Sequence, residues 1–477
     1  MMNRREVLKT LGGGVACAAA GAASAHLNVV FILMDDLGWA DIGCYGSRFY
    51  ETPNLDRLAR QSVRFTNAYA ACPVCSPTRA SILTGKYPAR LGLTNYLPGK
   101  HQLPYSKLLP PESVQFLAPE EITIAEAVKP AGYATASIGK WHLGPTAEYW
   151  PERQGFDVNI GGSSSGMPKS FFYPAWEGNP PIKGREGEYL TDRLTDEAVR
   201  FMKDNRSRPF FLYLPHYAVH VPIEAKKELI AKYKSKVKPG QFQNDPIYAA
   251  MIQSMDESVG RIMATLDELG IADRTVVFFN SDNGGLSAPE WKLVPVTSNA
   301  PLREGKGHVY EGGIREPLIV RWPGVKPRVE HTAVCSIDFL PTIIEAAGLP
   351  GRPDLHADGL SLAGLIKKSA PLPPRALYWH YPHYSNQLGK PAGAVRQGDF
   401  KLIEFYEDGR LELYNLKNDI GERHDLAREM PGRTRELHGM LTAWRRSVNA
   451  KMPTPNPKYD PARAEEGYWW REGTAPK

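Results

Sequence analysis

The stretch NVVFILMDD, residues 28–36, places an uninterrupted apolar run directly before two aspartates. An apolar run of this length without polar alternation predicts a strand that is buried on both faces, as in a parallel sheet. Similar runs recur along the chain, at ATASI (134–138), FFLYL (210–214), TVVFF (275–279) and LIVRW (318–322). The repeated run therefore indicates one large, mostly parallel sheet rather than a set of hairpins.

Helical patterns lie between these runs. TIAEAVKPAG (123–132) is one, and IYAAMIQSMDESVGRIMATLDELG (247–270) is another. The second places a stripe typical of core packing on one face: Met251, Met255, Val259, Ile262, Met263 and Leu266. Strands that alternate with helices predict an α/β fold with a central mixed, mostly parallel sheet flanked by helices.

A smaller C-terminal domain is predicted after the Pro-rich break SAPLPPR (369–375). DFKLIEF (399–405) and RLELYNL (410–416) follow it, and the turn YEDG joins them, which predicts an antiparallel hairpin. We expect a large domain over 26–370 and a smaller domain, with an antiparallel sheet and a helix, over 371–477. The Pro-, Lys- and Glu-rich end, 451–477, is expected to wrap the surface.

The first 25 residues are typical of an export signal. Arg4 and Arg5 precede a short apolar stretch that ends in Ala-Ser-Ala, and cleavage after Ala25 is expected. The paired arginines favour the twin-arginine route. A lipid-anchored Cys17 is the weaker alternative, because Gly14 is a poor lipobox residue. No apolar segment is long enough to span a bilayer, so we expect an exported protein, periplasmic or secreted.

Charge and cysteine content exclude several classes of protein. The formal net charge is +6 over 477 residues, and no basic stripe interleaved with aromatic residues indicates nucleic-acid binding. The cysteines beyond the signal are too few for a disulfide framework, and no second pair at zinc spacing follows Cys72 and Cys75. A thiol redox pair at these two positions stays open as an alternative, because C-x-x-C is a known thiol motif.

Polar side chains follow four of the predicted strands. Because parallel strands present their carboxyl ends at one edge of a sheet, we expect these side chains to meet there. Any single pair is explained more simply as a loop-capping aspartate or a surface histidine; the coincidence of four favours a site. The residues are Asp35, Asp36, Lys140, His142, His216, His220, Asp282 and Asn283.

Four of these side chains carry oxygen donors. Asp35, Asp36, Asp282 and Asn283 suit a hard cation, Ca²⁺ or Mg²⁺, better than zinc. Two loop-borne pairs favour Ca²⁺, because it tolerates irregular geometry. Three adjacent carboxylates also need a counter-charge, since like charges raise one another's pKa.

Cys75 lies at the predicted start of a helix. Ser76 is a good N-cap, Pro77 is favoured at the first helical position, and Gly85 ends the run PTRASILT. The N–H groups at a helix start attract anions, and Arg79 on the first turn adds a positive charge. The segment therefore predicts a site for a tetrahedral oxyanion.

These motifs resemble those of the formylglycine-dependent sulfatases, within the alkaline phosphatase superfamily. CSPTR (75–79) matches the C-x-P-x-R signature of that family, and the similarity extends over roughly residues 27–345. Other matching motifs, in the family's order, are DDLGWADIGCYG, TPNLDRLA, GKWHLG, GFD, SDNGG and LREGKGHVYEGGIREPLIVRWPG. The resemblance implies that a separate maturation enzyme oxidises Cys75 to formylglycine; an unmodified buried thiol is the alternative.

The resemblance also implies a role for each matching residue. One hydroxyl of the hydrated aldehyde attacks sulfur, and the second lets sulfate leave by elimination. One calcium ion is held by Asp35, Asp36, Asp282, Asn283 and the modified Cys75. Arg79 steadies the diol, Lys140 and Lys306 bind sulfate oxygens, His142 assists the elimination, and His220 protonates the leaving oxygen. His216 fits the family's H-x-P motif less well than His220, and His308 is expected at the pocket rim.

Substrate specificity is expected from the segment WHYPHYSNQLGKPAGAVRQGDFKLI (379–403). His383, Asn386 and Lys390 are predicted to bond sugar hydroxyls, and Tyr381 and Tyr384 to stack on sugar rings. A polar surface loop is the simpler alternative. The prediction is a carbohydrate O-sulfatase; a broad aryl sulfatase and a phosphonate or phosphodiester hydrolase are the alternatives. A binding protein without catalysis is disfavoured, because the catalytic residues are all present.

Overall fold

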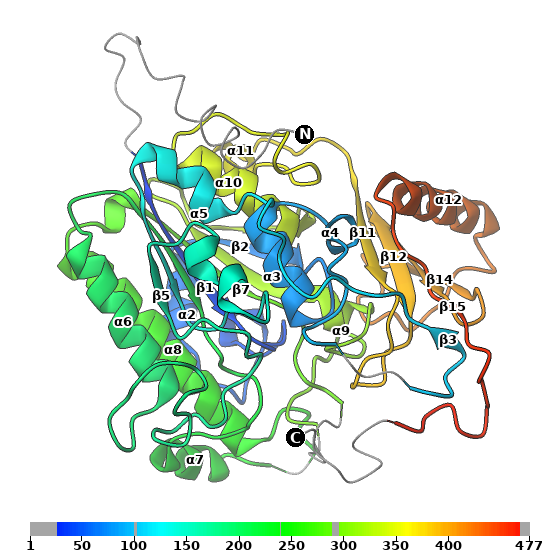
Figure 1. Cartoon of the computed structure of the whole chain (residues 1–477), viewed down its shortest axis with the longest axis horizontal. Helices are drawn as coiled ribbons and strands as arrows, with labels where there is room; N and C mark the ends of the chain where they lie inside the picture. Colours follow the sequence, from blue (N-terminus) through cyan, green and yellow to red (C-terminus); the bar gives the residue numbers. More distant parts are fainter. Residues whose placement is uncertain (1–25, 100–102, 239, 289–294, 468–477) are drawn as a thin grey trace.

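A computed structural model of the chain describes residues 26–99, 103–238, 240–288 and 295–467 (Figure 1). The expected signal, with Arg4, Arg5 and Cys17, lies outside the described residues. Two main sheets organise the described part of the chain, and a two-stranded pair joins β3 (Leu108–Leu109) to β15 (Thr454–Pro455). The last described stretch thus reaches back to a loop near residue 108.

The large sheet has nine strands in the order β10-β2-β8-β7-β1-β6-β4-β5, and β9 pairs with β2. Its centre is parallel, because β1 pairs in parallel with β6 and β7, and β4 with β5 and β6. β8 runs antiparallel to both neighbours, which makes the sheet mixed. The bounds are β1 Asn28–Met34, β2 Val63–Tyr69, β4 Ala134–Ile138, β5 Val158–Ile160, β6 Phe210–Pro215, β7 Thr275–Ser281, β8 Arg315–Arg321, β9 Arg328–Glu330 and β10 Val334–Cys335.

Successive side chains of β1 feed two separate cores. Val30, Ile32 and Met34 belong to one apolar cluster, and Val29, Phe31 and Leu33 to the other. This split follows from the two-residue period of a strand that is covered on both faces. The first cluster includes residues of α2 (Pro53–Arg60), α6 (Leu190–Asp204) and α8 (Pro246–Glu268); the second includes residues of α3 (Cys75–Thr84), α5 (Ile124–Val128) and α10 (Phe339–Ala346).

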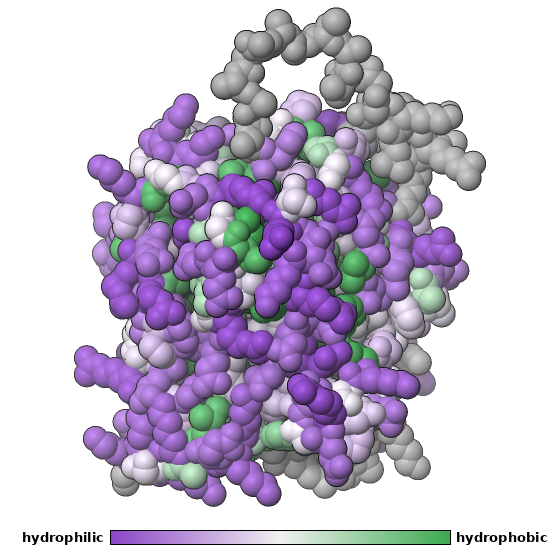
Figure 2. Space-filling model, turned by 90° about the vertical axis from the view of Figure 1, so that its left-hand side faces the viewer, coloured by the Kyte–Doolittle hydropathy of each residue, from purple (hydrophilic) through white to green (hydrophobic). Residues whose placement is uncertain are grey.

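Helices therefore lie on both faces of the large sheet, as Figure 1 shows. The outer surface on the side of α6 and α7 (Lys227–Lys234) is mostly hydrophilic, with small, separate hydrophobic spots (Figure 2). The apolar stripe predicted for residues 247–270 is confirmed. Met263 is partly buried against the core, and the other five residues are fully buried: Met251, Met255, Val259, Ile262 and Leu266.

The second sheet is antiparallel, with strand order β11-β12-β13-β14, and α12 (Pro431–Ser447) packs on it. Its strands are β11 Ala376–Tyr381, β12 Ala392–Gln397, β13 Phe400–Phe405 and β14 Leu411–Asn415. The predicted hairpin is confirmed as β13–β14. The fold class is thus confirmed, and the proposed division between 26–370 and 371–477 stays a prediction.

Some details of the predicted elements are wrong. Helix α3 begins at Cys75 with Val74 as its N-cap residue, so Ser76 is inside the helix and Pro77 is its third residue. β8 begins at Arg315, three residues before the predicted run. Strands β2 and β5 were not predicted, because β2 is only partly buried and β5 has three residues.

Candidate active site

The central parallel strands bring the predicted polar residues to one edge of the large sheet. Asp35 and Asp36 follow β1, and Asp282 and Asn283 follow β7. The two strands end side by side, because Met34 pairs with Ser281. Lys140 and His142 follow β4, and His220 lies in the loop after β6. All of these side chains are buried.

Three carboxylates form ion pairs with three basic side chains at this edge. Lys140 Nζ lies 2.6 Å from Asp35 Oδ2, and Lys306 Nζ lies 2.7 Å from Asp36 Oδ2. Arg79 places Nε and Nη2 each 2.8 Å from Asp282 Oδ2. Each acidic group is therefore paired with its own basic group in a place without solvent exposure, as buried charges require.

Burial raises the pKa values of the three acids and the neighbouring cations lower them, and the balance differs from one acid to the next. Burial raises the pKa of Asp282 to about 6, and the charge of Asp35 adds to this shift. Burial also raises the pKa of Asp35, against the charges of Lys140 and Arg79. For Asp36 burial acts in the same direction, but the charges of Lys306 and His220 outweigh it and lower the pKa to about 2.

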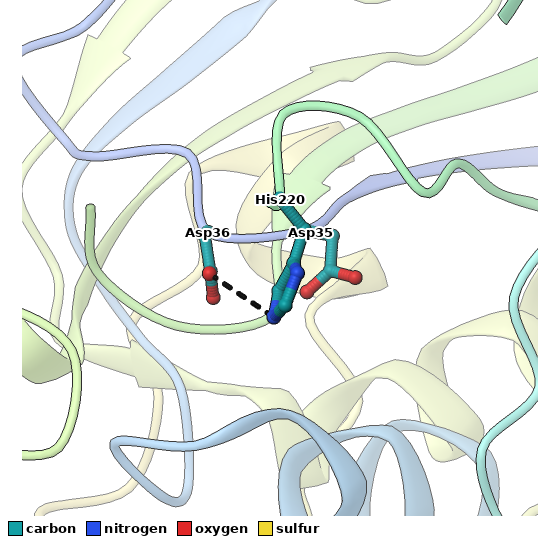
Figure 3. A group of neighbouring side chains, drawn as sticks. All are labelled: Asp35, Asp36 and His220. Atoms are coloured by element: carbon teal, nitrogen blue, oxygen red, sulfur yellow. Dashed lines mark ion pairs between the residues drawn. The ribbon is translucent and has the colours of Figure 1, made fainter. Parts of the chain in front are cut away.

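Asp35, Asp36 and His220 lie side by side (Figure 3). Their possible ligand atoms all lie within 4.8 Å of one another, and His220 Nε2 is 3.5 Å from Asp36 Oδ2. Asn283, in the loop after β7, donates from Nδ2 to Asp36 Oδ1 at 2.7 Å. His216, in contrast, bonds to Ser258 Oγ at 3.1 Å, so the structure places it beside α8 and not in this group.

Two oxygen atoms at this edge fit a hard cation. Asp35 Oδ1 and Asn283 Oδ1 are buried, and neither takes part in a hydrogen bond with any described residue. Buried polar atoms normally have a partner. These two oxygens have lone pairs that a bound cation would accept. Together with Asp36 and Asp282 they form an oxygen-only donor set, which suits Ca²⁺ or Mg²⁺.

Cys75 faces this cluster from the first turn of α3. Its Sγ lies 3.4 Å from His142 Nδ1, and burial raises the pKa of the thiol. Ser76 Oγ, from the same turn, lies 3.2 Å from the same nitrogen. His142 has a left-handed backbone (φ 58°), which a residue other than glycine adopts only at a cost.

His142 is held as a neutral base. Its Nε2 lies 2.5 Å from the carbonyl oxygen of Leu97, which can only accept, so Nε2 carries the proton. Burial lowers the pKa of His142 well below its usual value, and the charge of Lys140 adds to this shift. Nδ1 is therefore the free acceptor of the ring, and it faces Cys75 and Ser76.

Cys72 lies apart from this chemistry. It is 1% exposed, its Sγ is 4.0 Å from the carbonyl oxygen of Thr94, and burial raises its pKa. Cys72 and Cys75 are both free thiols. Reactive redox cysteines have lowered pKa values and partial exposure, and neither thiol has these features.

The residues predicted to read a sugar have mixed surroundings. Lys390 is 39% exposed, and His308 is 13% exposed with Nε2 donating to the carbonyl oxygen of Gln387 at 2.8 Å. His383 and Asn386 are 4% and 9% exposed, and they bond to Thr94 and Tyr96. Direct sugar contact by these four side chains stays a prediction.

Tyr381 and Tyr384 do not stack on a sugar, so that prediction is wrong. Tyr381 is fully buried, and Tyr384 is 4% exposed with its hydroxyl bonded to Glu407. Their rings pack inside the protein because this polar-looking segment contacts residues distant in sequence: Tyr381 donates to Asn95, and Tyr384 accepts from the N–H of Leu108. The sequence also missed Leu97, whose carbonyl fixes His142; a backbone role leaves no signal in the side-chain pattern.

Comparison with known proteins agrees with this geometry. A family model described as Sulfatase matches residues 27–349, which is more than half of the chain. The chain belongs to the sulfatase family. A second model, N-sulphoglucosamine sulphohydrolase, C-terminal, matches residues 305–446 of this sulfatase. The predicted family is thus confirmed, and the protein is a sulfatase enzyme of alkaline phosphatase-like fold.

Several relatives cover nearly all of this sulfatase. A sulfatase of Formosa agariphila is 34% identical and human arylsulfatase A is 32% identical, each over 89% of the chain and 88–89% of the relative. Human N-acetylgalactosamine-6-sulfatase is 37% identical over 70% of the chain and 65% of its own length. The crystal structure of Ps i-CgsB has a TM-score of 0.75 at 28% identity, covering 94% of this chain and 97% of that one.

Within the described residues, every helix falls short of the length and apolar character that crossing a bilayer requires.

Proposed function

We propose that this sulfatase removes an O-sulfate group from a sulfated saccharide, with formylglycine at residue 75 and one bound calcium ion. The observation that carries the proposal is Cys75 at the head of α3, buried against His142 and surrounded by paired charges. A buried thiol of raised pKa is a poor nucleophile, whereas its oxidised and hydrated form supplies two hydroxyls on one carbon.

A hard cation would be held by Asp35, Asp36, Asp282 and Asn283 together with residue 75. When bound, it supplies positive charge to the nucleophile and to the sulfate oxygens. The chain's own amines are arranged to share that task. Lys140 and Lys306 are now bonded to Asp35 and Asp36, the carboxylates that a cation would claim, so both amines would be available to an anionic substrate.

His142 is suited to handle the proton of residue 75. Its Nδ1 is the acceptor nitrogen, it lies 3.4 Å from Cys75 Sγ, and its Nε2 is fixed by Leu97. Arg79 cannot move toward the substrate freely, because it bonds Asp282 and the carbonyl oxygen of Lys140 at 3.0 Å. We assign it to holding the site together and steadying residue 75.

His220 is suited to protonate the leaving oxygen. Its Nδ1 lies 2.9 Å from the carbonyl oxygen of Val221, so this nitrogen donates and Nε2 faces Lys306 Nζ at 3.0 Å. The ring is 8% exposed, which places it nearer solvent than the fully buried Asp35. Lys306 Nζ can only donate, so Nε2 accepts in this arrangement; once Lys306 turns to sulfate and Nε2 takes up a proton, His220 can pass that proton to the oxygen that departs.

Saccharide substrates are supported by the relatives. Ps i-CgsB has been crystallised with k-i-k-neocarrahexaose, and the N-acetylgalactosamine-6-sulfatases are among the similar sequences. We propose that residues 26–370 carry the catalysis, and that residues 371–477 close the pocket, with Lys390 and His308 at its rim. Export through residues 1–25 and oxidation of Cys75 by a maturation enzyme belong to the same proposal.

A broad aryl sulfatase is the second candidate, because arylsulfatase A is 32% identical over 89% of the chain. The likeness to a phosphonate monoester hydrolase, at 19% identity and a TM-score of 0.63, shows the fold alone.

The test compares matched substrates on protein made with a maturation enzyme. Peptide mass spectrometry should show formylglycine at residue 75, and a panel of sulfated saccharides should include a substrate turned over with higher kcat/KM than a small aryl sulfate. Phosphate and phosphonate esters should be poor substrates. Full activity with an unmodified thiol at residue 75 would show that the proposed mechanism is wrong.

A further inference from the structure

Residues 381–389 contact two loops that are linked to proposed catalytic groups. One loop orients His142, and the other contains Lys306. The first loop is 94–97. Three side-chain hydrogen bonds join it to the segment: Tyr381 Oη to Asn95 Oδ1 at 3.2 Å, Thr94 Oγ1 with His383 Nε2 at 2.9 Å, and Asn386 Nδ2 to Tyr96 Oη at 3.1 Å.

The loop 94–97 ends at the group that orients His142. The carbonyl oxygen of Leu97 accepts a hydrogen bond from His142 Nε2, and the backbone N–H of Leu97 donates to Ser76 Oγ at 3.2 Å. A displacement of Leu97 would therefore free His142 Nε2, and neither the orientation of the ring nor the nitrogen that carries the proton would then be fixed by this bond. The hydrogen bonds from 381–386 act on the three residues just before Leu97.

The second loop, 306–308, lies between the same segment and the start of α3. His308 Nε2 donates to the carbonyl oxygen of Gln387 at 2.8 Å, and the N–H of Gly307 donates to the carbonyl oxygen of Pro73 at 2.8 Å. Gly307 has φ +85°, and a Cβ there would overlap Ser385 Oγ. The backbone of Lys306 is thus fixed by close packing on both sides.

We propose that residues 381–389 form a clamp that sets the positions of His142 and Lys306, with Tyr381, His383 and Asn386 as positioning residues rather than sugar contacts. The proposal rests on the proposed function, because it assigns those two groups to catalysis. The clamp side chains are at least nine-tenths buried, so water cannot replace a bond that is lost. A misplacement of about 1 Å at a catalytic group costs on the order of a hundredfold in rate.

The test removes single hydroxyls on the two sides of the clamp. Tyr381→Phe removes the bond to Asn95, and Thr94→Val removes the bond to His383. Thr434→Val is the matched control, because Thr94 and Thr434 are both 6% exposed, and Thr434 Oγ1 donates to the carbonyl oxygens of Ala427 and Met430 in the segment just before α12. Each protein is first checked for an equal formylglycine fraction by mass spectrometry.

Hydrogen–deuterium exchange is the first readout, and it needs no turnover. In both clamp variants, peptides that cover 94–97 should exchange several-fold faster, while peptides from α8 stay unchanged; Thr434→Val should alter neither. Kinetics is the second readout. The clamp variants should lose tenfold or more in kcat on a sulfated oligosaccharide and on a small aryl sulfate alike, with KM changed less than about threefold.

The two readouts separate failure of the clamp from failure of the proposed function. If the wild type hydrolyses no sulfate ester, the proposed function is wrong, and the exchange data still decide whether the clamp holds the loop. The clamp is wrong if both variants exchange and react like Thr434→Val, or if only the oligosaccharide reaction suffers, which would mean direct sugar recognition. If Tyr381→Phe does not fold, Thr94→Val alone carries the test.

Discussion

The buried ion pairs of Lys401 offer the sharpest stability test of how the antiparallel sheet is joined to the rest of the protein. Lys401 lies on β13, and its Nζ is 2.9 Å from Glu311 Oε1 and 2.9 Å from Glu422 Oε1; all three side chains are fully buried. Glu311 begins α9 (Glu311–Ile314), a few residues after Lys306. Lys401 thus connects the small sheet to the segment that carries a proposed sulfate ligand.

The perturbation is Lys401→Met, which keeps the stem of the side chain and deletes its charge. Two buried carboxylates would then share a site without the amine between them. Removal of one partner of a buried ion pair typically costs about 3–5 kcal/mol of unfolding free energy. Arg315, whose Nε lies 2.6 Å from Glu311 Oε2, still stabilises Glu311, so we expect a loss near the lower value.

The loss should grow with pH. Burial raises the pKa of Glu422 to about 7 even with Lys401 present, and its usual value is near 4.5. A carboxyl group with a raised folded pKa destabilises the protein as pH rises from its unfolded pKa through its folded one, because the folded state holds the proton more tightly. Without Lys401 this pKa rises further, so the difference from wild type should be larger at pH 8 than at pH 5.

The assay is urea unfolding followed by tryptophan fluorescence at the two pH values. Lys129→Met is the matched control, because Lys129 and Asp157 form an ion pair at 2.9 Å whose side chains are 45% and 43% exposed. Exposed pairs are worth about 1 kcal/mol or less, so this control should unfold almost like wild type. A Lys401→Met loss no larger than the control, or one that is equal at both pH values, would refute the reasoning.

Three further predictions concern the active site. Cys75→Ala should abolish turnover, and Cys75→Ser should show at most one trapped turnover, seen as a sulfated residue 75 by mass spectrometry. Asp282→Ala should lose bound calcium and activity together, measured by metal analysis and assay of the same sample; a fully active, metal-free variant would contradict this. His220→Ala should slow saccharide sulfates by about 10²–10⁴-fold but activated aryl sulfates far less, since only poor leaving groups need the proton.

Much of this fold was determined by the sequence alone. The apolar runs at 28–34, 134–138 and 210–214 each form a strand, because only a chain segment covered on both faces can be apolar throughout. The polar residues after those strands could be assigned to one edge for the same reason: parallel strands end together. The short motif around Cys75 predicts the start of a helix and, by its resemblance to the family signature, a formylglycine.

Only the tertiary structure decided which partners the side chains of the segment 379–403 have. Its histidines, tyrosines and amides have the composition of a sugar site, yet Tyr381 and Tyr384 are buried and His383 bonds to Thr94, 289 residues away in the chain. Composition records which groups can form hydrogen bonds, and it does not record whether their partners are a ligand or another part of the same protein. That choice depends on the docking of two sheets through contacts distant in sequence, and no local pattern encodes it.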